Sequence, residues 1–175
     1  YGYEGLGCIY WHMVSKLLLA VRENITEPKD SLLPFYKDVK KGLGSSKTPA
    51  EYGAFPFDPY SHTPYGQGAR QPGMTGQVKE EILTRWKELG VDIQDGQAVF
   101  MPAYLEKNEL DYDGQLHFTW CGTSIVYDAK QGEPMVVAYN DGKKSVFDGT
   151  VLPQKESRLL FTRSGKITEV RISTK

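Results

Sequence analysis

The spacing of apolar residues changes at Gly90, and this change limits what the chain can fold into. Before it, the segment Gln77 to Leu89 places its apolar side chains on one face at helical spacing. After it, short apolar stretches alternate with polar residues at a period of two. We therefore predict an α+β chain, with a helical segment over residues 1–91 and an antiparallel β domain over residues 92–175.

Three helices are expected in the helical segment, over Cys8 to Glu23, Leu32 to Lys41 and Gln77 to Leu89. Asp30 or Ser31 caps the second helix, where Pro34 is tolerated only in the first turn. The third is capped by Thr75 and stopped by Gly90. The first helix is apolar on nearly all sides, which predicts a neighbour, or self-association through an uncovered face.

The β domain is expected to contain about seven short strands joined by tight turns. Dipeptides typical of hairpin turns occur at Asp141-Gly142, Ser164-Gly165 and Cys121-Gly122. Such a pattern predicts an antiparallel β-sandwich or jelly-roll-like domain. The expected strands are Ala98–Met101, Gln115–Trp120, Thr123–Tyr127, Met135–Tyr139, Lys144–Phe147, Leu159–Thr162 and Ile167–Ile172.

Composition narrows the classes of partner. The formal net charge of -1 gives no basic excess to attract nucleic acid or an anionic membrane surface. No apolar run approaches the roughly 20 residues that a membrane-spanning helix needs. Cys8 and Cys121 form one disulfide or stay as buried thiols, the second being the preferred interpretation. No motif of metal-ligand spacing is present, so we expect neither a metal nor a cofactor.

Residues 42–76 are rich in proline, glycine and aromatic residues. A long irregular loop in a compact protein is usually functional or disordered, and this one is too aromatic for a disordered linker. The aromatic side chains either stack on sugar rings or fix the loop to a core, and the second interpretation is preferred. The carboxylates Glu51 and Asp58 lie in the same loop but give little indication of a catalytic pair.

Three segments occur in a recognisable order from residue 50 onward. The turn Pro72-Gly73-Met74-Thr75-Gly76 leads into a helix ending at Leu89-Gly90-Val91, and the short β segment Asp95 to Leu105 follows. This order resembles the end of the catalytic domain in inverting glycoside phosphorylases of the cellobiose phosphorylase type. The resemblance implies the last part of an (α/α)6 toroid followed by a C-terminal β domain, in a large bacterial protein.

In those phosphorylases the loop before the last helix helps to bind phosphate and sugar. The resemblance implies a substrate-binding role at Tyr60, His62, Arg70, Gln71, Thr75 and Gly76. The chemistry suits an anion, because arginine offers a forked cation and a helix start offers free amide groups. The alternative is an ordinary helix cap with a nearby surface arginine.

The family's general acid belongs to an earlier part of the toroid, so we expect no turnover from this chain alone. It begins Tyr1-Gly2-Tyr3, without a methionine or a basic leader, and we expect a piece of a larger protein whose compartment is left open. The first hypothesis is a C-terminal fragment of a glycoside hydrolase or phosphorylase, partnered by its upstream part and by a carbohydrate or inorganic phosphate. The second is a non-catalytic carbohydrate-binding or scaffolding β module with a helical docking element.

Overall fold

The computed structural model describes residues 6–27, 29–42, 77–102, 105 and 107–174. The chain divides into two compact units, residues Tyr1–Lys87 and Glu88–Lys175, which we call unit 1 and unit 2. The boundary expected from the sequence, between residues 91 and 92, falls at the first residue of strand β1 (Val91–Gln94).

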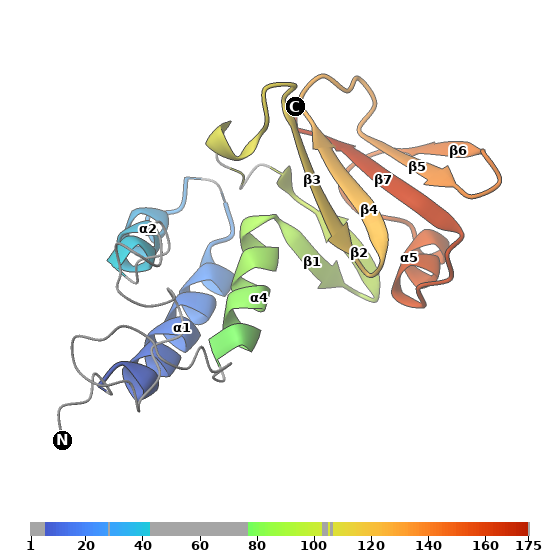
Figure 1. The fold of residues 1–175 in the computed structure, drawn as a ribbon. Helices are drawn as coiled ribbons and strands as arrows, with labels where there is room; N and C mark the ends of the chain where they lie inside the picture. The colour runs from blue at the N-terminus through green and yellow to red at the C-terminus, as the bar shows by residue number, and fades with distance from the viewer. Residues whose placement is uncertain (1–5, 28, 43–76, 103–104, 106, 175) are drawn as a thin grey trace. The chain divides into compact units, whose positions relative to one another are not determined.

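Unit 1 contains, in its described part, helices α1 (Leu6–Asn24) and α2 (Leu33–Gly42) and almost all of α4 (Gln77–Glu88) (Figure 1). The three helices predicted from the sequence are confirmed. Asp30 caps α2, since its carboxylate accepts a hydrogen bond of 2.9 Å from the Leu32 amide. Pro34 lies in the first turn of α2, where a helix tolerates proline.

A buried arginine joins two helices of unit 1. Arg22 of α1 donates from Nη2 to the carbonyl oxygen of Lys87, in the last turn of α4, at 2.6 Å. It also donates from Nη1 to the carbonyl oxygen of Ile25, just after α1, at 3.2 Å. The last carbonyl groups of a helix have no partner within it, so Arg22 satisfies acceptors at the C-terminal ends of both helices.

Unit 2 contains a two-stranded and a five-stranded sheet (Figure 1). β1 pairs with β2 (Gln97–Phe100) as an antiparallel hairpin. The larger sheet has the strand order β3-β4-β7-β5-β6. Its strands are β3 (Gln115–Trp120), β4 (Thr123–Asp128), β5 (Met135–Tyr139), β6 (Lys144–Phe147) and β7 (Ile167–Ser173); the short helices of unit 2 are η2 (Lys107–Glu109) and α5 (Gln154–Phe161).

Six of the seven expected strands are confirmed, but the strand predicted over Leu159–Thr162 is wrong. That segment is the end of helix α5, which buries Glu156, Ser157 and Leu160 at helical spacing. Ser164-Gly165 therefore joins a helix to β7 and is not a hairpin turn. Strand β1 is not predicted from the sequence, because a strand of four residues is too short to show a clear period of two.

The larger sheet is mixed, so the prediction of a purely antiparallel domain is wrong at one pair of strands. β7 runs parallel to β4, with Ile125 opposite Val170, and antiparallel to β5. Parallel neighbours need a crossover connection, which the chain makes through β5, β6 and α5. The fold is thus of the mixed α+β kind, and the sandwich or jelly-roll-like closure stays a prediction.

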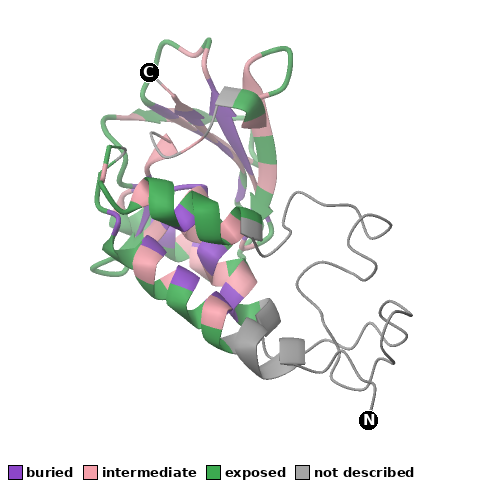
Figure 2. Cartoon of the chain, turned by 90° about the vertical axis from the view of Figure 1, so that its left-hand side faces the viewer, coloured by how far each residue is buried: buried purple, intermediate pink, exposed green. Residues whose placement is uncertain are grey.

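The core of unit 2 lies on one face of the larger sheet, against α5 and β2. The rings of Phe100 and Phe161 lie edge-on to Trp120, each with ring centres 5.8 Å from it. The hydroxyl of Tyr127 donates to the carbonyl oxygen of Leu89 at 2.6 Å, and burial raises the pKa of this tyrosine. Figure 2 shows the buried residues in purple along the central strands. Ile125, Met135, Val137, Leu152, Leu160, Val170 and Ile172 complete this core.

Gly90 ends the helical segment for a geometric reason. Its φ is +68°, a left-handed conformation that favours glycine, and a Cβ atom there would lie 1.9 Å from the carbonyl oxygen of Met101. The carbonyl oxygen of Gly90 accepts a hydrogen bond of 2.8 Å from the Met101 amide. The stop predicted at this residue is confirmed, and no larger side chain fits there.

Cys121 carries a free thiol at the β3–β4 turn and is half-buried, so the expectation of a fully buried thiol is wrong for this cysteine. Partial burial raises the pKa of the thiol, and the nearby positive charge of Arg163 acts in the opposite direction. Its φ of +50°, followed by +77° at Gly122, is that of a tight hairpin turn, which confirms the turn predicted there.

Candidate functional site

The substrate-binding residues expected from the sequence lie outside the described part of the chain. This holds for Tyr60, His62, Arg70, Gln71, Thr75 and Gly76, and for the loop carboxylates Glu51 and Asp58. Their roles therefore stay predictions. The described polar residues that gather in one place belong instead to unit 2, on the face of the larger sheet opposite its core.

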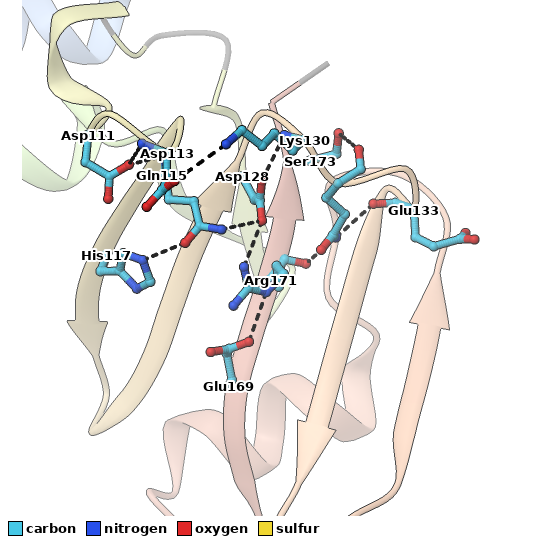
Figure 3. A network of polar contacts seen from close by, with 11 residues as sticks. Asp111, Asp113, Gln115, His117, Asp128, Lys130, Glu133, Glu169, Arg171 and Ser173 are labelled. Carbon is cyan, nitrogen blue, oxygen red and sulfur yellow. Dashed lines mark hydrogen bonds and ion pairs between the residues drawn. The ribbon is translucent and has the colours of Figure 1, made fainter.

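We call this surface the polar face and define it by Gln115 and His117 of β3, Asp128 of β4, and Glu169 and Arg171 of β7 (Figure 3). Side chains alternate between the two faces of a strand, and the strand register aligns those that point away from the core. The polar face thus follows from the same alternation that builds the core.

Asp128 is the centre of the polar face. Its Oδ2 accepts hydrogen bonds of 2.8 Å from both Gln115 Nε2 and Arg171 Nη1, while its Oδ1 accepts one of 2.8 Å from the Lys130 amide. Arg171 also donates from Nε to Glu169 Oε1 at 3.1 Å. One buried carboxylate of β4 therefore fixes side chains from β3 and β7, as Figure 3 shows.

The electrostatics of Asp128 reflect two opposing effects. Burial by itself raises the pKa of a carboxyl group, because it penalises the charged form. The Lys130 amide, the Arg171 guanidinium and the Gln115 amide favour the carboxylate and hold the pKa of Asp128 below its usual range. The group is therefore a stable anion at neutral pH, and it serves as a structural acceptor rather than as a proton donor.

His117 extends the polar face along β3. Its Nε2 lies 3.0 Å from Gln115 Oε1, and an amide oxygen can only accept, so in this assignment the imidazole carries a proton on Nε2. Val126 lies between His117 and Arg171 in the strand register and is fully buried even though it points to this side of the sheet. The polar side chains thus shelter an apolar floor.

A rigid turn precedes β3 at the edge of the polar face. Asp111 Oδ1 accepts hydrogen bonds from the amides of Asp113 at 2.9 Å and Gln115 at 2.8 Å. The Lys130 ammonium lies 3.6 Å from Asp113 Oδ1. Between the two aspartates, the side chain of Tyr112 is 96% exposed. The turn therefore presents an exposed tyrosine side chain on a backbone that is held by hydrogen bonds.

The sequence carried a partial signal for this site. The charged residues of 166–171 alternate with apolar ones, a pattern that predicts the solvated side of a sheet, and Glu169 and Arg171 confirm this. The charged residues of 155–158 give the same prediction, which is wrong there because they belong to α5 and Glu156 among them is buried. The role of Asp128 is not predicted from the sequence, although a carboxylate at the end of an apolar strand indicates a cationic partner.

Among the described residues of unit 1, two buried polar side-chain atoms lack a hydrogen bond, Glu80 Oε2 and Thr84 Oγ1, on one side of α4. Within the described residues, no three histidine, cysteine or acidic side chains come together as a metal site would require. None of the helices described is both long enough and apolar enough to span a bilayer. No protein-family model matches the chain, and no curated protein is significantly similar to it.

Proposed function

We propose that this chain is a non-catalytic segment of a carbohydrate-active protein, which docks through unit 1 onto the rest of that protein and supports its sugar site. The carbohydrate class comes from the resemblance to the end of a phosphorylase toroid. The loop of residues 42–76 would contribute Arg70 and its neighbours to that site, with a sugar or inorganic phosphate as ligand.

The observation that carries the docking role is that the described part of unit 1 buries only a small apolar core, with Leu18, Ile25 and Tyr36 in it, and leaves other large apolar side chains exposed. Phe35 of α2 is 70% exposed, and Met13 and Leu17 of α1 are exposed by more than half. At the same time Ser15 and Thr84 are buried. Soluble domains bury large apolar side chains and expose polar ones, and exposed apolar groups that cluster mark interaction sites.

These exposed residues have helical spacing, which is what a docking face requires. Met13 and Leu17 are four residues apart, so they lie one above the other on α1. Leu32, just before α2, and Phe35 and Val39 within it are three and four residues apart, so they also lie along one face. Two stripes of this kind fit helices that continue a helical assembly, which is the arrangement that the toroid resemblance implies.

The structure of unit 2 fits a supporting role better than that of an independent sugar-binding module. A module that stacks sugars on its sheet needs aromatic rings on an open face. Trp120 is 4% exposed, and Phe118 and Tyr127 pack against one another on the core side with ring centres 5.4 Å apart. The opposite face is polar, and Asp128 joins its strands by hydrogen bonds, which suits a supporting domain rather than a platform for stacking sugars.

The docking role is tested by the association state of the whole chain. We expect sedimentation velocity at increasing concentration to show self-association, because uncovered apolar stripes find one another when their natural partner is missing. The triple variant Met13→Ser, Leu17→Ser, Phe35→Ser should sediment as a monomer. A triple serine variant of exposed polar residues, Lys16→Ser, Glu23→Ser, Lys37→Ser, serves as the matched control.

A wild-type chain that stays monomeric and binds no hydrophobic dye would show that the stripes are not a docking face. The sugar role is tested separately by calorimetric titration with neutral disaccharides and with phosphate. Saturable binding that Arg70→Ala abolishes would support a ligand site in the loop. Hydrolysis or phosphorolysis of a disaccharide by the chain alone would contradict the non-catalytic assignment.

A further inference from the structure

We infer that the polar face is a second contact site for a neutral saccharide, recognised by hydrogen bonds rather than by stacking on the sheet. The saccharide class rests on the proposed function. The site itself stands on its own geometry, because three of its five side chains, Arg171, Glu169 and His117, have hydrogen-bonding capacity that their contacts within the described protein leave unused.

Three atoms supply this capacity. Arg171 bonds through Nη1 and Nε, which leaves Nη2 as a donor. Glu169 accepts at Oε1, which leaves Oε2 as an acceptor. His117 faces Gln115 through Nε2, which leaves Nδ1 as an acceptor when the imidazole is neutral.

A hydroxyl group both donates and accepts, so a donor beside an acceptor is the pair that recognises it. Arg171 Nη2 and Glu169 Oε2 belong to side chains joined by a 3.1 Å contact, and these are 28% and 33% exposed. Vicinal hydroxyl groups of a sugar ring present the complementary pair. The polar face therefore matches a polyhydroxylated ligand better than a ligand with only donors or only acceptors.

Charge balance argues for a neutral ligand. Arg171 is the only cation among the five residues of the polar face, and it is bonded to two carboxylates, Asp128 and Glu169. Its positive charge is thus already compensated, and an added phosphate would meet Glu169 as a like charge. A neutral ligand escapes this repulsion, so the polar face differs from the anion site expected at Arg70.

Binding at this site should immobilise the side chains at little cost in free energy, because the strands and Asp128 already fix them. Binding normally loses free energy to immobilise side chains, and preorganised groups avoid part of that loss. A few hydrogen bonds predict millimolar affinity, which suits a contact that assists a main site.

The test is a titration of the isotope-labelled whole chain with cellobiose, maltose and laminaribiose, followed by NMR shifts of backbone amides. We expect one of them to shift amides of β3, β4 and β7 saturably, and Glu169→Ala or His117→Ala to weaken this binding about tenfold. Glu133→Ala, which removes an exposed carboxylate elsewhere in unit 2, is the matched control and should leave the affinity unchanged. Glu169→Gln, which keeps the side-chain shape, replaces Glu169→Ala if the alanine variant loses its dispersed spectrum.

Three results would overturn the inference. The first is no shift of these amides by any of the sugars up to about 50 mM. The second is equal or stronger shifts with inorganic phosphate, which would indicate an anion site. The third is sugar binding that Arg70→Ala abolishes and the unit 2 variants leave intact, which would leave the proposed function standing. Failure of the proposed function shows instead in the sedimentation experiment, which does not depend on the polar face.

Discussion

Unit 1 and unit 2 differ in how completely they separate apolar from polar side chains. Unit 2 has an apolar core in which Phe100, Ile125 and Leu160 are fully buried, and its polar side chains are paired on the other side of the sheet. Unit 1 buries Glu80 and Thr84 while Phe35 is exposed. The two units therefore differ in the polarity of the surface they expose, which is the difference that the proposed docking of unit 1 onto further protein requires.

The largest expected effect comes from matched phenylalanine substitutions. Phe100→Ala in unit 2 should lower the free energy of unfolding by about 4 kcal/mol, because it leaves a cavity beside Trp120. Phe35→Ala in unit 1 should change it by less than about 0.5 kcal/mol, because the ring is exposed. Amide hydrogen exchange along β4 and α2 reports each unit separately. Equal losses from both substitutions would mean that the side chain of Phe35 is covered in solution.

The second effect concerns the ion pair of the polar face. Asp128→Asn should destabilise unit 2 by about 2 kcal/mol at pH 7, less than a fully buried pair because Arg171 stays partly exposed. The pKa of Asp128 is lowered in the folded state from its ordinary value of 3.8, so the unfolded chain binds the proton more readily. The stabilisation is therefore complete above about that value and is lost as the pH falls through the folded-state pKa.

The pH dependence gives that prediction its control. Measured by thermal unfolding, the wild type should become less stable as the pH falls below about 4, and Asp128→Asn should remove part of this pH dependence. Thr119→Ser, which changes no charge on the same face of β3, should leave the acid limb unchanged. An unchanged acid limb in Asp128→Asn would instead show that other carboxyl groups cause the acid sensitivity.

Local patterns predicted most elements of both units but not how they assemble. β3, β4, β5 and β6 were predictable because alternation and turn residues act within a few positions. The helix α5 was mistaken for a strand because Leu159, Leu160 and Phe161 form a short apolar run that fits either structure. The parallel pairing of β4 with β7 depends on that helix, so one error led to the other.

The polar face was harder to predict for the same reason. Asp128 and Arg171 are 43 positions apart, and only the register of β4 against β7 brings them together. From sequence alone, Arg171 is an ordinary charged residue on the solvated face of a strand, and Asp128 lies just beyond the strand expected over Thr123–Tyr127. The resemblance pointed instead to residues 42–76, so sequence and structure indicate different surfaces and the two proposals need separate tests.

The smallest expected effect compares two buried hydroxyl groups, one in each unit. In unit 2 the Ser157 hydroxyl donates to the carbonyl oxygen of Leu152 at 2.7 Å and accepts from the Ala98 amide at 3.0 Å. Ser157→Ala should therefore cost about 1–2 kcal/mol, since it leaves a buried amide unsatisfied. In unit 1 the Thr84 hydroxyl is 2% exposed and has no hydrogen-bond partner.

Thr84→Val keeps the shape of the side chain and removes only a desolvated hydroxyl, so it should be neutral or stabilise unit 1 by up to about 1 kcal/mol in the isolated chain. Hydrogen exchange along α4 measures this difference. If the same substitution weakens docking onto the remaining protein, the hydroxyl finds its partner across that interface. A destabilised isolated chain would mean that the group is already satisfied by water, and unit 1 would then be closer to a self-sufficient domain than its polarity indicates.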